Sequence, residues 1–294
     1  ALNKDYKTED WDVVILEQQA IVDKLKATEA VKKAENSKQL NDVNEAQQLV
    51  SVLPEGDAKA SLQQIIDKIR TAEVSNAKEL EDALNNEVIV KIIFKADITT
   101  DKHLYIKNAN VVIDGKKNDK ENYILKASNK VVKDQFGRNS VLIVEAANGV
   151  KISNLTIDAS DANTELNSEG GAKWDSLYAL QVFNSTGVEL NNLTLKGGDA
   201  GLLVNSAQVI ANNITTIDNE FGGIEVSKSS DTNVKIEPKL TIKGTSTHND
   251  KAGTPNVWID GKTTNNDWVS YEAGAYNEQP ESGKNQLWFF KNNK

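Results

Sequence analysis

Two carboxylates on repeated, strand-like segments are the residues best placed for catalysis. Glu225 lies within Gly223-Ile224-Glu225-Val226, and Asp260 directly follows Asn256-Val257-Trp258-Ile259. If these segments are adjacent strands, the two positions are about 8 Å apart. An inverting glycosidase needs two carboxylates roughly 6.5–9.5 Å apart. A glycoside hydrolase that uses Glu225 and Asp260 is therefore one hypothesis, although an acidic surface offers such pairs by chance.

A second group of acidic residues could bind a metal ion. Asp158, Asp161 and Asp175 carry the carboxylate oxygens that Ca²⁺ prefers, and Trp174 offers a flat face to a sugar ring. The simpler interpretation is a solvated acidic loop, because the spacing of an EF-hand is absent. We expect no cofactor, with calcium at these aspartates as the alternative.

Composition excludes several classes of function. The 294 residues carry a net charge of −9, which would repel the phosphates of nucleic acid. Without cysteine there is no disulfide, thiolate metal site or cysteine nucleophile. No apolar run reaches the roughly 18 residues of a membrane-spanning helix. His103 and His248 are the two histidines, and their separation in the sequence argues against a histidine metal site.

An internal repeat predicts the elements that position these side chains. The phrase Asn154-Leu155-Thr156-Ile157 recurs as Asn192-Leu193-Thr194-Leu195 and Asn213-Ile214-Thr215-Thr216, each time after an aliphatic run. The step from Gly201 to Gly223 is 22 residues. Units of this size, with short strands, can form the coils of a parallel β-helix, whose aliphatic faces stack inside. Asn tolerates a left-handed backbone and can bond to Asn in the next coil, so we expect a structural column rather than glycosylation sites.

The outward side chains of the best-defined strand predict a binding surface. Alternation along the strand places two columns outward, and they are Ile143, Gln181, Leu203, Glu225 and Trp258, then Glu145, Phe183, Asn205, Ser227 and Asp260. Their apolar members must be covered or meet a ligand. Cover by the long segments 116–140, 159–176 and 245–255 is the simpler interpretation. The alternative is a groove in which aromatic rings stack on sugars and polar groups bind hydroxyls, formed by Trp174, Gln181, Phe183, Asn205, Glu225 and Trp258.

The N-terminal quarter has helical periodicity instead. Apolar residues recur at three-to-four spacing in three stretches, which begin near Val13, Leu40 and Leu62. The first stretch contains Val13, Leu16, Ala20, Val22 and Leu25. Pro54 predicts a break before the third helix, with Asp57 as its cap. These patterns predict an antiparallel bundle of about three helices over residues 1–72.

The remaining chain, 73–294, is predicted to be the β-helix with a cap at each end. A short helix over 75–86 is expected to cover the first coil, with Ser75 as its N-cap and Glu79 near the capping-box position. The aromatic-rich segment 262–294 is expected to cover the last coil.

Residues 76–262 resemble the pectate-lyase-like β-helix superfamily, on Val88–Phe94, Val111–Gly115 and the three Asn phrases. The resemblance implies a mostly β fold, a right-handed single-stranded parallel β-helix. It does not choose among lyases, glycosidases, esterases, phage tailspikes and non-catalytic surface proteins. A lyase of this type would need an Arg or Lys base above the strand face, and neither outward column contains Arg, Lys or His.

The helical part has a resemblance of its own. The segment from Ala30 to Ile69 resembles a module of Gram-positive surface proteins and of accessory domains of some Bacillus insecticidal toxins, on Ala34-Glu35, Asp42-Val43, Ala46-Gln47, Leu53-Pro54 and Leu62. This implies an exported spacer or binding module.

These observations favour a non-catalytic, secreted or cell-surface protein that binds a polysaccharide or a cell-wall or host-surface glycan. We expect it to be a monomer that neither binds nucleic acid nor inserts into a membrane. The alternatives are a polysaccharide-degrading enzyme, a hydrolase rather than a lyase, and a structural stalk or toxin-associated module.

Overall fold

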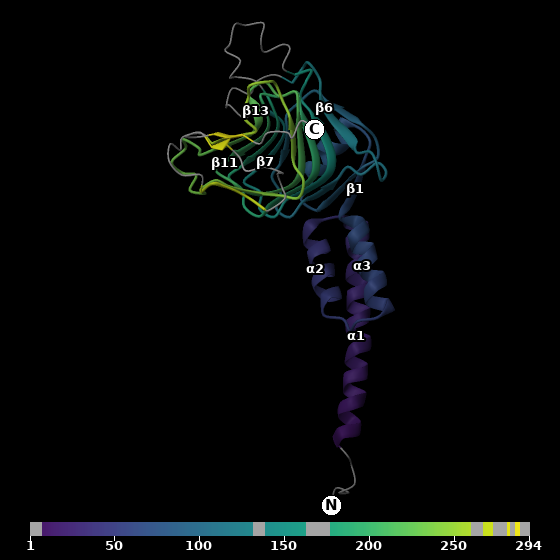
Figure 1. Cartoon of the computed structure of the whole chain (residues 1–294). Coiled ribbons are helices and arrows are strands. Elements are labelled where there is room, and N and C mark those ends of the chain that lie inside the picture. Colours follow the sequence, from purple (N-terminus) through teal and green to yellow (C-terminus); the bar gives the residue numbers. More distant parts are fainter. Residues whose placement is uncertain are drawn as a thin grey trace, which may run out of the picture. The chain divides into compact units, whose positions relative to one another are not determined.

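The computed structural model forms two compact units (Figure 1). One unit comprises Ala1–Ala72 with Glu87–Ile89, and the other comprises Glu73–Asn86 with Val90–Lys294. Among the residues that the structure describes, no helix is long and apolar enough to cross a membrane. The described residues are 8–131, 139–162, 177–259, 267–272, 281–282 and 286–288.

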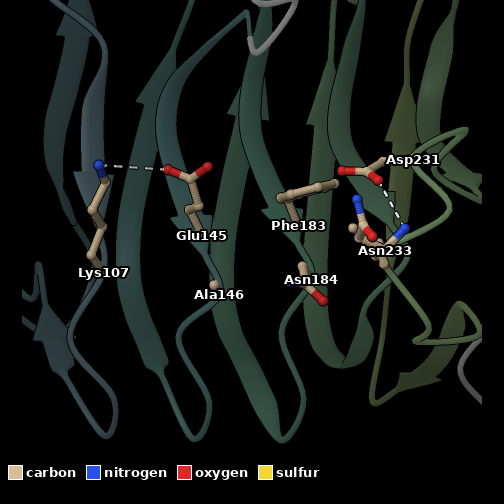
Figure 2. A pocket seen from close by; sticks show the side chains of 8 residues that line it. Lys107, Glu145, Ala146, Phe183, Asn184, Asp231 and Asn233 are labelled. Carbon is tan, nitrogen blue, oxygen red and sulfur yellow. Dashed lines mark hydrogen bonds and ion pairs between the residues drawn. The ribbon is translucent and has the colours of Figure 1, made fainter.

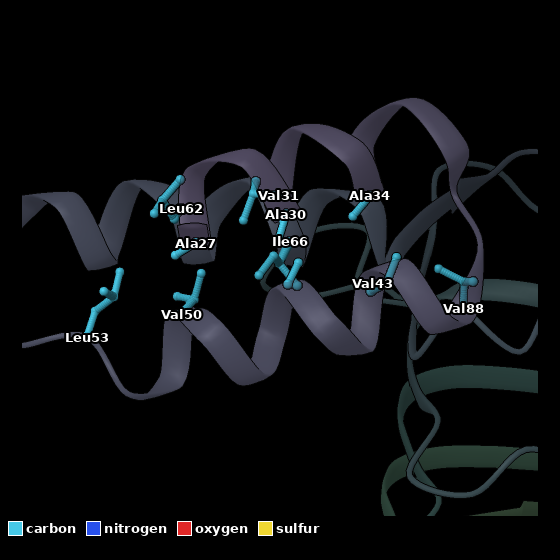
Figure 3. Packing of buried hydrophobic residues seen from close by; sticks show 11 residues of the cluster. Ala27, Ala30, Val31, Ala34, Val43, Val50, Leu53, Leu62, Ile66 and Val88 are labelled. Atoms are coloured by element: carbon cyan, nitrogen blue, oxygen red, sulfur yellow. The ribbon is translucent and has the colours of Figure 1, made fainter. Parts of the chain in front are cut away.

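Three helices make the first unit: α1 (Thr8–Ser37), α2 (Leu40–Ser51) and α3 (Asp57–Ile69). Small and β-branched side chains fill their core, and Val88 packs among them (Figure 3). The main core residues are Ala27, Ala30, Val31, Ala34, Val43, Ala46, Val50, Leu53, Leu62 and Ile66. Asp57 is the first residue of α3 rather than its cap. Gly56 takes the cap position without a side-chain bond, at a φ of 152° that favours glycine.

The apolar face expected in the first half of α1 does not enter this core. Val13, Leu16, Val22 and Leu25 are 54%, 69%, 41% and 59% exposed, and Ala20 is exposed too. The reason is length, because 30 helical residues span about 45 Å whereas the 12 and 13 residues of α2 and α3 span about 18–20 Å. Burial therefore begins at Ala27, and α1 continues beyond its two neighbours (Figure 1).

The second unit is strand-rich and consists of two long, mainly parallel sheets in a β-helix-like arrangement. The first follows the order β1 (Thr71–Val74), β2 (Lys91–Phe94), β5 (Val112–Asp114), β8 (Lys151–Asp158), β10 (Val188–Lys196), β12 (Gln208–Ile217), β14 (Lys239–Lys243) and β17 (Val269–Tyr271), with β3 (Ile98–Thr100), β6 (Tyr123–Ala127) and β15 (Thr247–Asn249) off this path. The second follows β4 (Leu104–Ile106), β7 (Ser140–Glu145), β9 (Tyr178–Phe183), β11 (Ala200–Asn205), β13 (Gly222–Ser227), β16 (Val257–Ile259), β19 (Gln286–Trp288) and β18 (Glu281–Ser282). From β7 to β14 the chain alternates between the sheets, so each segment lies on the one before.

The predicted repeat is confirmed by the register. Leu180 pairs with Leu202 and Leu202 pairs with Ile224, so that the step between these three coils is 22 residues. The predicted inward side chains, such as Leu142 and Val182, are at most 1% exposed. Each coil thus buries its aliphatic face against its neighbour.

The Asn column is also confirmed as a structural device. Asn154, Asn192 and Asn213 all have left-handed backbone, with φ of 53–55°. The side-chain amide of Asn192 donates to Asn154 Oδ1 (3.1 Å), and that of Asn213 donates to Asn192 Oδ1 (3.0 Å). Asp114 accepts from Asn154 at one end, and Asn213 accepts from the backbone of Thr245 at the other.

A short helix, α4 (Ala77–Leu84), packs against β3 and β4 with its apolar face buried. Its N-cap is Asn76, one residue later than predicted: Asn76 Oδ1 accepts from the Glu79 amide (3.0 Å). Glu79 in turn accepts from the Ser75 amide (2.7 Å). Asn76 and Glu79 thus form a capping-box-like pair that begins one residue later than predicted. Asn is as good an N-cap as Ser, so it can take this position.

Two of the predicted long loops contain strands. β6 lies within 116–140, and β15 lies within 245–255. Segment 159–176 is outside the described residues beyond 162, as is most of the predicted C-terminal cap at 262–294. The β6 strand was missed because its turn-rich flanks, with Lys116 and Asn118, obscured a five-residue run.

Candidate functional site

The second sheet carries the candidate site on its outward face. Its parallel register places Ile143 beside Gln181, Gln181 beside Leu203, Leu203 beside Glu225 and Glu225 beside Trp258. A second column runs from Glu145 through Phe183 and Asn205 to Ser227. Both columns therefore lie in the order that the sequence predicted.

Most of the first column is covered. Ile143, Gln181 and Leu203 are 0%, 4% and 7% exposed. Gln181 Oε1 accepts a hydrogen bond from Ser140 Oγ (3.3 Å), which holds its amide within the fold. Trp258 is half-buried, and Phe221 packs against its ring edge-on with 5.3 Å between the ring centres. The first column is therefore largely covered and does not form a wide surface on which sugar rings could stack. Gln181 bonds to Ser140 within the fold.

The segment that follows β13 lies beside the second column and forms one wall of a groove. The Ser229 amide donates to Ser206 Oγ (2.9 Å), which fixes the segment close to the end of β11. Asp231 and Asn233 then face Phe183 of β9, and Asn233 N donates to Asp231 Oδ1 (2.8 Å) in a tight turn (Figure 2). Phe183 is 7% exposed, and it forms part of the lining of the groove.

This groove, which we call the β7–β9 groove, is open to solvent and has a volume of about 520 Å³. It is lined by Lys107, Glu145, Ala146, Phe183, Asn184, Asp231, Asn233 and Val234 (Figure 2). Lys107 Nζ lies 3.8 Å from Glu145 Oε2, so the groove contains an ammonium, carboxylates and amides around one aromatic ring. Such a mixture of donors and acceptors beside an apolar surface is typical of sites that bind small polar ligands.

Of the residues predicted to bind sugar, Phe183 lines this groove and Asn205 pairs beside it in the sheet. Asn205 Nδ2 donates to Ser227 Oγ (2.8 Å). Trp258 and Glu225 lie farther along the stack of strands, and Trp174 is outside the described residues. Asp231 and Asn233 were missed, because nothing in the sequence shows that segment 228–238 packs beside Phe183. Lys107 was missed as well.

Glu225, the first of the two predicted catalytic carboxylates, is half-buried and hydrogen-bonded. Tyr178 Oη donates to Glu225 Oε2 (3.0 Å), and Trp258 is its neighbour in the next strand. Asp260, the second carboxylate, lies outside the described residues. The structure therefore gives the environment of Glu225 but not the separation on which the hydrolase hypothesis depends.

The predicted calcium ligands are engaged by cations of the protein itself. Asp158 lies 3.0 Å from Lys196 Nζ, and Asp161 lies 2.9 Å from Lys126 Nζ. Burial raises the pKa of Asp158, but hydrogen bonds from Ser160 and the charge of Lys196 outweigh it, so the pKa falls below its ordinary value. Asp175 is outside the described residues. Within the described ranges, no group of three or more metal-binding side chains is present.

A buried polar cluster surrounds His248 of β15. Thr216 Oγ1 lies 2.8 Å from His248 Nδ1 and donates to Asp250 Oδ2 (2.6 Å). Asn219 Nδ2 donates to Asp250 Oδ1 (2.6 Å), and Asn219 Oδ1 accepts from the Gly198 amide (2.9 Å). Burial raises the pKa of Asp250, although these hydrogen bonds oppose the shift. Thr216 and Asn219 are fully buried, so the centre of this cluster lies inside the fold.

Comparison with known proteins does not add a family to these observations. No protein-family model matches this chain, and no curated protein matches it. The β7–β9 groove and the half-buried Glu225 are the features on which the functional proposals below rest.

Proposed function

We propose that this chain is a non-catalytic, secreted or cell-surface protein that binds a glycan in the β7–β9 groove. We further propose that its strand-rich unit is a right-handed, single-stranded β-helix of the pectate-lyase-like type. The observation that carries the binding proposal is the lining of the groove, in which Phe183 lies between the Lys107–Glu145 pair and the Asp231–Asn233 turn. Hydroxyl groups of a sugar both donate and accept hydrogen bonds, so they match a groove that offers both.

Lys107 Nζ lies 3.8 Å from Glu145 Oε2, so both members of this ion pair are placed to bond to the hydroxyl groups of a bound sugar. Export is proposed from the two sequence resemblances, and a secretion assay of the full-length gene product would test it.

Glycan binding to the intact chain is the direct test, with a glycan array followed by calorimetry. Glu145→Gln should weaken binding about tenfold or more, because hydrogen bonds to charged groups contribute about 1.5–3 kcal/mol. Glu189→Gln is the matched control, since Glu189 also lies on a strand and pairs with a lysine, Lys151, at 3.1 Å. Binding that is lost equally in both variants, or no binding to any glycan, would contradict the proposal.

A second candidate is a polysaccharide hydrolase that uses Glu225. The observation in its favour is a half-buried carboxylate beside an aromatic ring, held by the Tyr178 hydroxyl. Release of reducing ends from a polysaccharide panel, abolished by Glu225→Gln, would establish cleavage and overturn the non-catalytic proposal. A chain that neither binds nor cleaves glycans would instead be a structural stalk.

A further inference from the structure

The first half of α1 exposes an unusual amount of apolar surface. Six large side chains lie on one side of it, and we call them the α1 stripe: Trp11, Val14, Ile15, Ile21, Val22 and Leu25. Their exposed fractions range from 41% to 62%. At 3.6 residues per turn they fall within about 120° of the helix circumference, with Gln18 among them. A continuous stripe of this kind marks a surface that binds another protein or a membrane.

A second, smaller apolar line lies on the other side of the same segment. Val13 and Ala20 continue the heptad spacing of Ala27, which is buried in the three-helix core, and Leu16 lies between them. The α1 stripe is therefore not an extension of the face that α2 and α3 cover. It is a separate surface, and it faces away from the line of Ala27.

The composition of the segment indicates that it needs a partner to be a stable helix. Val13, Val14, Ile15, Ile21 and Val22 are β-branched and lose side-chain freedom in a helix. Helices in water gain most of their stability from packing an apolar face rather than from propensity. In the first half of α1, Gln19 Nε2 donates to Asp23 Oδ1 (2.8 Å), a contact one helical turn away.

Charge argues against a lipid surface as the partner. Helices that lie on membranes carry Lys or Arg on their polar face, whereas Asp12, Glu17 and Asp23 accompany Lys24 here. The exposed segment from Trp11 to Leu25 is about 22 Å long, so it is also too short to span the roughly 30 Å hydrocarbon core of a bilayer.

We propose that two copies of this chain associate through the α1 stripe as an antiparallel helix pair. With Gln18 opposite Ile21 of the second copy, Val14 meets Leu25, and Leu25 meets Val14. Ile15 then flanks Val22 of the second copy. Every apolar residue of the stripe between Val14 and Leu25 finds an apolar or long aliphatic neighbour in this register.

Charge complementarity selects this antiparallel register. It brings Glu17 of each copy beside Lys24 of the other, so that two opposite-charge pairs border the stripe. A parallel pair would instead place Glu17 beside Val22 of the second copy. The antiparallel arrangement also puts the α2–α3 ends of the two copies at opposite ends of the pair, where they do not compete for the same part of α1.

The proposed dimer differs from the monomeric state that we expected from the sequence. Because the stripe is short compared with a standard interface, we expect a dissociation constant on the order of micromolar. Sedimentation velocity of the full chain from roughly 1 to 300 μM should show conversion from monomer to dimer. A chain that remains a monomer throughout this range, or forms a higher oligomer, overturns the proposal.

Matched variants locate the interface. Ile21→Glu should weaken association at least about tenfold, because each dimer would bury the new carboxylate twice. Leu16→Glu introduces the same charge on the same helix but outside the stripe, and the dimer should persist. Equal loss in both variants, or loss in Leu16→Glu alone, places the contact elsewhere and contradicts the proposal.

A charge exchange tests the orientation without an apolar substitution. Glu17→Lys should weaken the dimer several-fold by opposing two lysines twice, and Glu17→Lys combined with Lys24→Glu should restore it. Failure of the double variant to restore association would overturn the antiparallel register. Binding of the wild-type chain to anionic phospholipid vesicles, with loss in Ile21→Glu, would overturn pairing in favour of a membrane surface.

Discussion

The interior of the strand-rich unit and the first half of α1 use similar aliphatic side chains with opposite results. Leu142, Val182 and Leu193 are at most 1% exposed, whereas Leu16 and Leu25 of α1 are 69% and 59% exposed. In the repeat, each coil is followed by another coil that covers it, so the chain itself supplies the partner. In α1 the two later helices are too short to reach the early turns. Periodicity therefore predicts the type of element, but burial depends on what the rest of the chain provides.

The largest effect should come from removing matched leucines from the two regions. Leu193→Ala should lower the free energy of unfolding by about 2–5 kcal/mol, because it leaves a cavity between paired coils. Leu16→Ala should change it by no more than about 0.5 kcal/mol, as is usual for exposed positions. Chemical denaturation followed by circular dichroism measures both. A loss at Leu16 comparable with that at Leu193 would show that α1 is covered and would remove the contrast.

A smaller effect should come from the Asn column, which stabilises the bends between coils. Asn192→Ala removes one donated and one accepted side-chain bond and forces Ala into a left-handed backbone. We expect a loss of about 2–4 kcal/mol in the free energy of unfolding, from the hydrogen bonds and the strain together. Asn192→Gly keeps the backbone conformation accessible, so the difference between the two variants measures the strain. Equal stability of Ala, Gly and Asn at this position would show that the column is dispensable.

The repeat could be predicted well from the sequence because each coil carries residues that mark its alignment with the next coil. Inward aliphatics and the Asn bends recur at matching positions, so that even the pairing of Trp258 with Glu225 followed from alignment of the phrases. The candidate site was less predictable. Gln181 and Phe183 were placed in the correct columns, but the groove beside Phe183 is completed by Asp231, Asn233 and Val234, and no pattern in segment 228–238 shows where it packs.

The helical and buried polar elements show a second limit. Neighbouring residues can compete for the N-cap position of a helix. The N-cap of α4 is therefore Asn76, one residue after the predicted Ser75. The cluster around Asp250 was invisible in the sequence, because Thr216 and Asn219 come from one coil and His248 and Asp250 from the next. Contacts between coils that lack a repeated phrase leave no local signal.

The smallest effect is a change in pH dependence, carried by two aspartates of the strand-rich unit whose pKa values shift in opposite directions. The pKa of Asp250 is raised above its ordinary value of 3.8, so between the two values the folded state holds a proton that the unfolded state has released. Its contribution to stability is complete below pH 3.8 and is lost as the pH rises through the folded pKa. The pKa of Asp158 is lowered, so its contribution is present above pH 3.8 and is lost as the pH falls through the folded pKa.

Asparagine substitutions should separate these two windows. Asp250→Asn can still accept from Asn219 and can donate to Thr216, so the cluster stays bonded while the titrating group is removed. The decline in stability above pH 3.8 should therefore flatten in Asp250→Asn, while Asp158→Asn should flatten the decline on the acid side instead. Urea denaturation at pH steps from roughly 3 to 7 measures both slopes. An unchanged slope in Asp250→Asn would mean that the pKa of Asp250 is the same in the folded and unfolded states. The interior of the coils would then be as tolerant of charge as the open surface of α1.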